Sequence, residues 1–261
     1  MDKFVKIIYI FTFLYTLSSA QTTNDYCQYD CSGKTHTVCL RKDVNCGKGS
    51  TCGSNYRPIP LTDADRRFVL DVHNKLRNKV ASGQETSGNQ PSASNMKAVS
   101  YSKELETIAQ CHTNNCVFAH DQCRRTAPYS WVGQNIGSRS YSGSTGDYKT
   151  ASNLTIYSWY SEVKDFNNSW VGSFGNYPTS KAVGHYTQVV WANTIKVGCA
   201  LTFYTTTDNW NTYLMACNYA PGGNIVGQSV YEVGAPASAC GASGVNPTYS
   251  ALCGPDDILD S

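Results

Sequence analysis

Residues 184–194 read GHYTQVVWANT, and residues 214–224 read LMACNYAPGGN; the two segments are separated by 19 residues, 195–213. The second lies in a stretch of aromatic and aliphatic residues, Thr212–Tyr219. A similar stretch, Val197–Thr205, precedes it across a polar turn, which predicts an antiparallel hairpin. In the first segment, His185 follows Gly184 in an irregular context next to a turn, where binding groups are often displayed.

Helical patterns lie upstream of this hairpin. Thr62 as N-cap, with Asp65 three residues later, begins an apolar stripe that continues to Val80. We expect helices from Thr62 to Gly83, from Ser102 toward Cys116 and from about Ser152 to Lys164, and a strand at Lys97–Tyr101. Helices and a few strands therefore interleave, which predicts one α+β layered domain.

Composition excludes several classes of function. The chain has 261 residues, of which 15% are charged, and its net charge is +2, with 21 Lys and Arg against 19 Asp and Glu. This balance gives no basic surface for nucleic acid or anionic membranes. There are 12 Cys without a Cys-x-x-Cys pair, which favours a disulfide framework over zinc clusters.

The first 20 residues have the pattern of a signal peptide. Lys3 and Lys6 precede an apolar run from Ile7 to Leu17, and small residues follow up to Ala20. The run is too short to span a bilayer, and no later run is longer. We expect residues 1–20 to be removed and the mature chain to be secreted, extracellular and without a membrane span.

The mature chain is expected to divide into three parts. Residues 21–60 read as an irregular Cys-rich arm, residues 61–233 as the folded domain, and residues 234–261 as a short tail. Two sequons, at Asn153 and Asn167, are candidates for glycosylation.

The two opening segments resemble, position by position, the two signatures of the CAP superfamily, which comprises the cysteine-rich secretory, antigen 5 and pathogenesis-related proteins. Residues 73–77 (HNKLR), 116–120 (CVFAH) and 159–162 (WYSE) add to the resemblance. Residues 25–27 (DYC), 120–124 (HDQCR) and 133–136 (GQNI) are most similar to the antigen 5 branch of insect venom and saliva. The resemblance implies a three-layer α-β-α sandwich, the CAP domain, with a disulfide-stapled N-terminal arm and a short C-terminal tail.

The resemblance also implies disulfide pairs. It assigns Cys27–Cys39, Cys31–Cys123, Cys46–Cys116 and Cys199–Cys217. The four cysteines that remain are then expected to pair as Cys52–Cys111 and Cys240–Cys253.

CAP domains have a cleft lined by two histidines and two acidic residues, and the matching positions here are His120, Gln134, Glu162 and His185. Gln134 keeps an acceptor oxygen but carries no charge, so a metal should bind less tightly than at a site with two carboxylates. His120, His185 and Glu162 are therefore expected to bind Zn²⁺ only weakly, and no cofactor is required. The alternative is that the tetrad is a hydrogen-bonded polar cluster that supports the sheet.

We expect the protein to act by binding a ligand and not by catalysis. The sequence has no Gly-x-Ser-x-Gly elbow and no His-Glu-x-x-His motif, and all cysteines can pair. We expect a monomeric, non-enzymatic, antigen 5-like venom or salivary protein that binds a small host mediator, whether lipid, eicosanoid or amine. The alternatives are a metal-dependent hydrolase, or an adhesion antagonist that contacts a host receptor through Arg41-Lys42-Asp43, where some relatives carry Arg-Gly-Asp.

Overall fold

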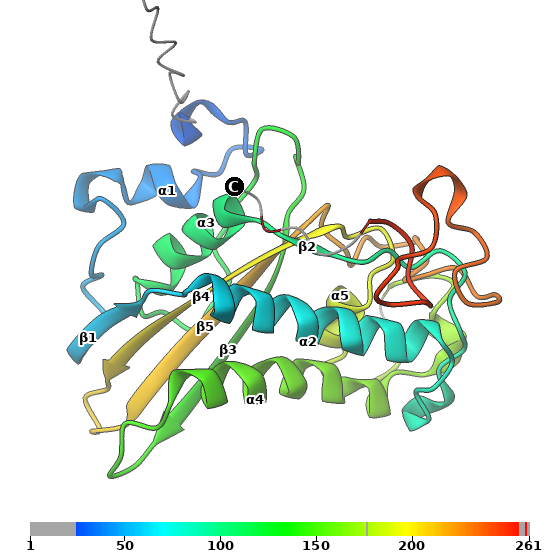
Figure 1. Ribbon diagram of the computed structural model, residues 1–261. Coiled ribbons are helices and arrows are strands. Elements are labelled where there is room, and N and C mark those ends of the chain that lie inside the picture. Colours follow the sequence, from blue (N-terminus) through cyan, green and yellow to red (C-terminus); the bar gives the residue numbers. More distant parts are fainter. Residues whose placement is uncertain (1–24, 176, 256–258, 260–261) are drawn as a thin grey trace, which may run out of the picture.

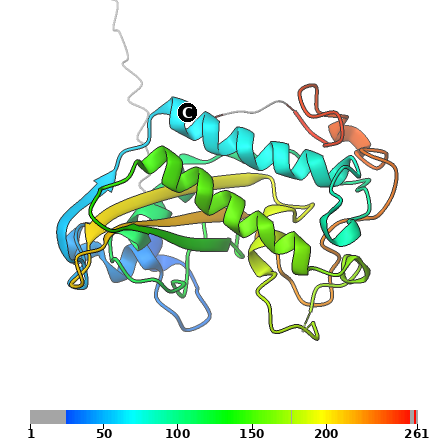
Figure 2. The same cartoon turned by 90° about the horizontal axis from the view of Figure 1, so that it is seen from below.

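The computed structural model describes residues 25–175, 177–255 and 259 (Figure 1). The expected signal peptide, residues 1–20, lies outside these residues. A central sheet separates two layers of helices, as Figures 1 and 2 show. The expected three-layer α-β-α sandwich is therefore confirmed.

The sheet has the strand order β1-β4-β5-β3, so β3 forms one edge. These strands are β1 (Ser54–Ile59), β4 (Lys196–Thr205), β5 (Asn211–Ala220) and β3 (Gly133–Tyr141). Neighbouring strands are antiparallel, and the short β2 (Ser100–Tyr101) pairs with β4 in parallel.

The helices divide between the two faces of the sheet. One face carries α2 (Asp63–Ala81), α4 (Tyr148–Tyr160) and α5 (Gly184–Val189). The other carries α3 (Lys103–Thr113), against which the arm helix α1 (Thr37–Leu40) packs. Single 3₁₀ turns are Tyr26–Gln28, Lys42–Val44, Ser87–Asn89, Ser161–Asp165, Asn168–Trp170 and Gly241–Ser243.

Side-chain size differs between the two faces of the β4–β5 hairpin. Large residues such as Phe203 and Met215 belong to the main core beneath α2 and α4. Ala200 and Ala216 instead pack against Ala109 of α3. At Gly198, a Cβ atom would lie 2.4 Å from the Ser102 carbonyl oxygen, so α3 can approach β4 only because this residue has no side chain.

Several expected elements have the predicted place and type. Thr62 and Asp65 form the predicted capping box of α2, the second helix begins after Ser102, and the hairpin is formed by β4 and β5. The third helix starts earlier than expected because the Asp147 carboxylate caps it by accepting the Thr150 N–H.

Other elements were not anticipated. Residues 54–59, expected in the irregular arm, form the edge strand β1, and β3 and α5 were not predicted. The strand expected at Lys97–Tyr101 is only two residues long.

The tail contributes to the core. The Tyr249 hydroxyl donates to the Asp71 carboxylate of α2 at 2.8 Å, and the Ala251 N–H donates to the Asn78 side chain at 3.0 Å. Tyr249 and Leu252 are buried. Within the described ranges, no helix combines the length and the apolar character that crossing a membrane requires.

Four of the six predicted disulfides are present: Cys27–Cys39, Cys31–Cys123, Cys199–Cys217 and Cys240–Cys253. The other two predictions, Cys46–Cys116 and Cys52–Cys111, are wrong. The structure pairs Cys46 with Cys111 and Cys52 with Cys116.

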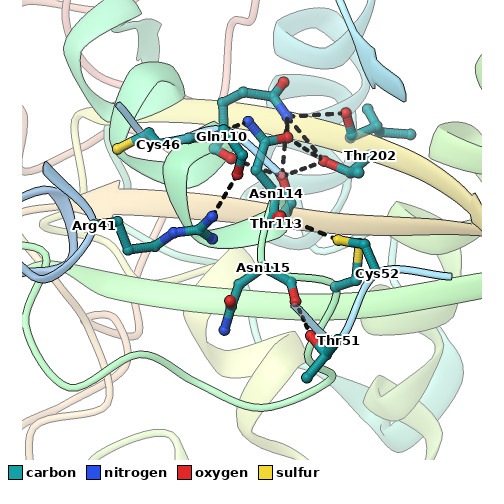
Figure 3. The surroundings of a disulfide bond; sticks show 12 residues. Arg41, Cys46, Thr51, Cys52, Gln110, Thr113, Asn114, Asn115 and Thr202 are labelled. Carbon is teal, nitrogen blue, oxygen red and sulfur yellow. Dashed lines mark hydrogen bonds between the residues drawn. A yellow bond between two sulfur atoms is a disulfide. The ribbon is translucent and has the colours of Figure 1, made fainter. Parts of the chain in front are cut away.

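The direction of the arm explains this correction (Figure 3). Arg41 donates to the Cys111 carbonyl at 2.9 Å, and farther along, the Gly49 N–H donates to the Asn114 carbonyl at 2.8 Å. The arm thus runs along the C-terminal end of α3 in the same direction as the helix. Cys46 therefore lies beside Cys111, and Cys52, later in the arm, lies beside Cys116. Crossed pairs would require the arm to run in the opposite direction.

This pairing predicts which thiol is released when one partner is removed. In Cys46→Ser, iodoacetamide should label Cys111, because that side chain loses its partner while Cys116 stays bonded to Cys52. Fragmentation mass spectrometry of the peptide that contains both cysteines locates the label. Labelling at Cys116 would instead support the crossed pairing.

Arg77 of α2 is fully buried and joins several segments through its guanidinium. Its nitrogen atoms make six hydrogen bonds, from 2.6 to 3.3 Å long, to the carbonyl oxygens of Lys97, Val189, Trp191, Ala192 and Thr194. Burial lowers the pKa of Arg77 to about 9. Because that value is above neutral pH, the side chain stays charged and holds five carbonyl dipoles around it.

Replacing Arg77 with Met should therefore lower the free energy of unfolding by about 3 kcal/mol or more, because buried carbonyl oxygens lose their donors. Urea denaturation measures this loss. The control is Arg67→Met, at an exposed position of the same helix, for which we expect a change within about 0.5 kcal/mol. Equal stabilities of the two variants would contradict the assigned role of Arg77.

Candidate functional site

Glu162 and His185 form the first half of the predicted tetrad. The His185 Nδ1 atom donates to Glu162 Oε1 at 2.7 Å. The other carboxylate oxygen, Oε2, accepts the backbone N–H groups of His185 at 2.9 Å and Tyr186 at 3.1 Å. These N–H groups belong to the first turn of α5, whose own N-cap residue Val183 supplies no side-chain hydrogen bond. Glu162 therefore caps α5 from another element and fixes the orientation of the His185 imidazole.

His120 and Gln134 form the second half. The His120 Nδ1 atom donates to Gln134 Oε1 at 2.8 Å, and Gln134 Nε2 donates to Asp121 Oδ1 and Asn218 Oδ1, both at 3.1 Å. The acceptor-only carboxylate of Asp121 determines which way the Gln134 amide points.

Asp121 was not predicted as a site residue. Its carboxylate also accepts hydrogen bonds from Arg124 Nε and from the Thr37 hydroxyl of the arm. The only signal in the sequence was its place between His120 and Cys123 in the HDQCR run.

The two halves are held from opposite sides of the edge strand β3. Gln134 and Asn135 are consecutive in this strand, so their side chains leave opposite faces. Gln134 holds His120, whereas Asn135 Nδ2 donates to the His185 carbonyl at 3.1 Å. Among the described residues, the Nε2 atom of neither histidine has a hydrogen-bond partner.

The expected metal ligands His120, His185 and Glu162 are not assembled as a three-ligand site. No group of three or more His, Cys, Asp and Glu side chains in the described part of the chain is placed to hold a metal ion. The physical reason is that both oxygens of Glu162 already accept N–H groups of His185 and Tyr186. Glu162 is thus a positioning residue for His185.

A buried polar chain connects the tetrad to α2. The His73 Nδ1 atom donates to the Val69 carbonyl at 2.7 Å, so Nε2 accepts from the Tyr219 hydroxyl at 3.0 Å. Tyr219 in turn accepts from Asn135 Nδ2 at 3.4 Å. Burial lowers the pKa of His73 to about 4, and the nearby Arg77 charge acts in the same direction. His73 is therefore neutral at physiological pH, as this donor pattern requires.

The two signature segments contact each other directly. The Gly223 N–H donates to Gln188 Oε1 at 2.9 Å, and the Thr187 hydroxyl donates to Asn224 Oδ1 at 2.7 Å. The Asn224 amide donates back to the Gly184 carbonyl at 2.8 Å. These bonds attach α5, and hence His185, to the loop that follows β5.

The candidate glycosylation sites differ in exposure. Asn153 is half-buried within α4, whereas Asn167 is exposed and accepts the Ser169 N–H at 2.9 Å.

Comparisons with known proteins agree with this fold. Residues 70–219 match the family described as "CAP: Cysteine-rich secretory protein family". The chain is 38% identical over 240 residues to Venom allergen 3 of Solenopsis invicta, covering 89% of this chain and 99% of that protein. It is 41% identical over 213 residues to Venom allergen 5.02 of Dolichovespula maculata, covering 80% of this chain and 94% of that protein.

Among solved structures, one titled "Crystal structure of NaASP2 with Zn2+" aligns with a TM-score of 0.63 at 32% identity, covering 77% of this chain and 99% of that chain. The sandwich and the contacting signature segments define a CAP domain, and the chain belongs to the cysteine-rich secretory protein (CAP) family. Within this family it is an antigen 5-like protein, as its similarity to the venom allergens shows.

The pKa of His73 predicts a pH dependence of stability. The folded pKa, about 4, is below the ordinary value of 6.5, so the unfolded chain binds the proton more tightly. Stability is therefore complete above pH 6.5 and falls as the pH decreases toward 4. In His73→Gln this contribution is absent. The free energy of unfolding should therefore decrease less between pH 6.5 and 4, by on the order of 3 kcal/mol.

Denaturation series of both proteins at several pH values measure this difference. An Ala64→Ser variant, at an exposed position of the same helix, removes no titratable group; it serves as the control and should keep the slope of the unmodified protein. Identical slopes for His73→Gln and the unmodified protein would show that the histidine titrates alike in both states.

Proposed function

We propose that this chain is a secreted protein that acts by binding a small mediator, a lipid, an eicosanoid or an amine, and not by turnover. The observation that supports it best is the hydrogen bonding of the tetrad. Glu162 accepts three N–H groups and Gln134 carries no charge, so neither supplies a free general base. The relatives named venom allergens support a role as a venom or salivary effector.

The structure gives no support to the two alternatives. For the metal-dependent hydrolase, no group of three His, Cys, Asp or Glu side chains in the described ranges is placed to hold a metal ion, and Gln134 offers no charged general base. The adhesion motif requires an exposed Arg41, but this side chain is 8% exposed and is bonded to two backbone carbonyls.

Zn²⁺ is not required in this proposal. The donors that remain are the Nε2 atoms of His120 and His185, and two neutral ligands bind Zn²⁺ weakly compared with a closed four-ligand site.

A binding protein must be present in amounts comparable to its ligand, whereas an enzyme acts at far lower amounts. Titrating the protein into a fixed amount of fatty acid, eicosanoid or biogenic amine should therefore remove the mediator with saturation near one equivalent. Native mass spectrometry of protein from its own source would show a retained ligand as added mass. Product that accumulates over many equivalents, and is lost in His185→Ala, would make the tetrad catalytic and refute the proposal.

A further inference from the structure

His36 is a buried histidine of the arm, and it lies directly before α1. The residue is only 1% exposed. Its Nδ1 atom accepts the Val38 N–H at 3.1 Å, so the imidazole is the N-cap of this helix. Its Nε2 atom lies 2.9 Å from the carbonyl oxygen of Arg125, in the segment that follows α3. One imidazole therefore joins the arm helix to a segment 89 residues later in the chain.

These two contacts determine the protonation state of the imidazole. A carbonyl oxygen can only accept a hydrogen bond, so Nε2 must carry a proton, and a backbone N–H can only donate, so Nδ1 must carry none. Only the neutral imidazole meets both conditions. In the charged form Nδ1 is also a donor and would face the Val38 N–H, so the cap of α1 would be lost.

Two tyrosines of the arm cover the imidazole. The ring of Tyr26 is stacked on it with the centroids 4.7 Å apart, and the ring of Tyr29 contacts it edge to face at 6.0 Å. The Tyr26 hydroxyl donates to the Glu104 carboxylate at 3.2 Å, and the Arg125 guanidinium lies 5.5 Å from the centre of the Tyr29 ring. His36 is thus enclosed by aromatic rings, with a cation beyond one of them.

Charged groups of both signs lie near His36. Burial lowers the pKa of His36, the Arg125 carbonyl and the Asp121 carboxylate raise it, and the guanidinium groups of Arg124 and Arg125 lower it again. Asp121 forms an ion pair with Arg124, so its charge is already compensated. The net effect is a lowered pKa, which means that an opened arm binds the proton more tightly than the closed one.

We propose that protonation of His36 opens the contact between α1 and residues 121–125, so that the arm is held tightly at neutral pH and loosely in acid. The Cys27–Cys39 and Cys31–Cys123 disulfides stay intact, so the opening is local and reversible. This inference concerns the arm alone and does not depend on the proposed binding function.

Opening of α1 also affects the link between the arm and the tetrad. The Thr37 hydroxyl donates to the Asp121 carboxylate and to the Cys123 carbonyl, and both bonds are released with the helix. Asp121 in turn accepts from Gln134, which holds His120. Acid therefore loosens the arm from this half of the tetrad.

Amide hydrogen exchange of the disulfide-bonded protein at pH 7.0 and 5.0, followed by NMR, tests the proposal. Protection factors, which correct for the pH dependence of intrinsic exchange, are compared for the amides of Thr37, Val38, Leu40 and Arg41, all of which are hydrogen-bonded in the closed arm. Protection should be at least about fivefold lower at pH 5.0. The limit is about thirtyfold, which an ordinary pKa of 6.5 in the opened arm sets.

Two variants assign the effect to His36. His36→Asn keeps a side-chain acceptor for the Val38 N–H but has no group that titrates in this range, so its protection factors should be equal at the two pH values. The control is His112→Gln, which removes a second buried histidine that lines the same cavity as Thr37. This variant should retain the difference.

The ¹⁵N chemical shifts of the His36 imidazole give a second measurement, which uses the unmodified protein and so holds even if His36→Asn fails to fold. At pH 7.0 Nε2 should carry the proton and Nδ1 should not, and the ring should titrate with a midpoint below 6.5. Equal protection at both pH values, a difference that persists in His36→Asn, or a proton on Nδ1 at pH 7.0 would overturn the proposal.

Discussion

The buried guanidinium of Arg77 is the contact on which the rest of the fold depends. Burying a cation costs several kcal/mol unless polar groups replace its water shell, and here five backbone carbonyls do so. These carbonyls come from the segment before β2, the end of α5 and the loop that follows it. The need to replace the water shell of one side chain thus places two separate segments, one around Lys97 and one from Val189 to Thr194, against the C-terminal half of α2.

His73 lies one turn before Arg77 on α2 and extends this arrangement to the site. It stays neutral in the core, in part because Arg77 is charged, and only the neutral imidazole can accept from Tyr219. Tyr219 and His185 share Asn135 as a hydrogen-bond donor. The position of His185 therefore depends on groups in the core as well as on Glu162.

An amide at position 134 is matched to its neighbours. Gln134 accepts from His120 and donates to Asp121 and Asn218, so all of these contacts use the two ends of one amide. A glutamate here could accept from His120 but would place a second carboxylate against Asp121. Through Asp121 and Thr37, the same network reaches the arm, which the disulfides hold against α3. The arm is therefore linked by hydrogen bonds to the half of the tetrad that contains His120 and Gln134.

The sequence by itself determined the elements whose signals are local. The Thr62 and Asp65 capping box, the apolar stripe of α2 and the aromatic and aliphatic β4–β5 hairpin each arise from side chains a few residues apart, and all are present. The two signature segments predicted the family and the sandwich through their resemblance to the CAP signatures, and in the structure the two segments are hydrogen-bonded to each other.

Only the tertiary structure decided the features that depend on distant groups. The direction of the arm along α3 selected Cys46–Cys111 and Cys52–Cys116, and no local pattern carries that direction. Likewise, the sequence named Glu162 and His185, but packing alone turned the Glu162 carboxylate toward the α5 N–H groups. A carboxylate binds whichever donors the fold brings nearest, and in this chain those donors come from residues more than twenty positions away.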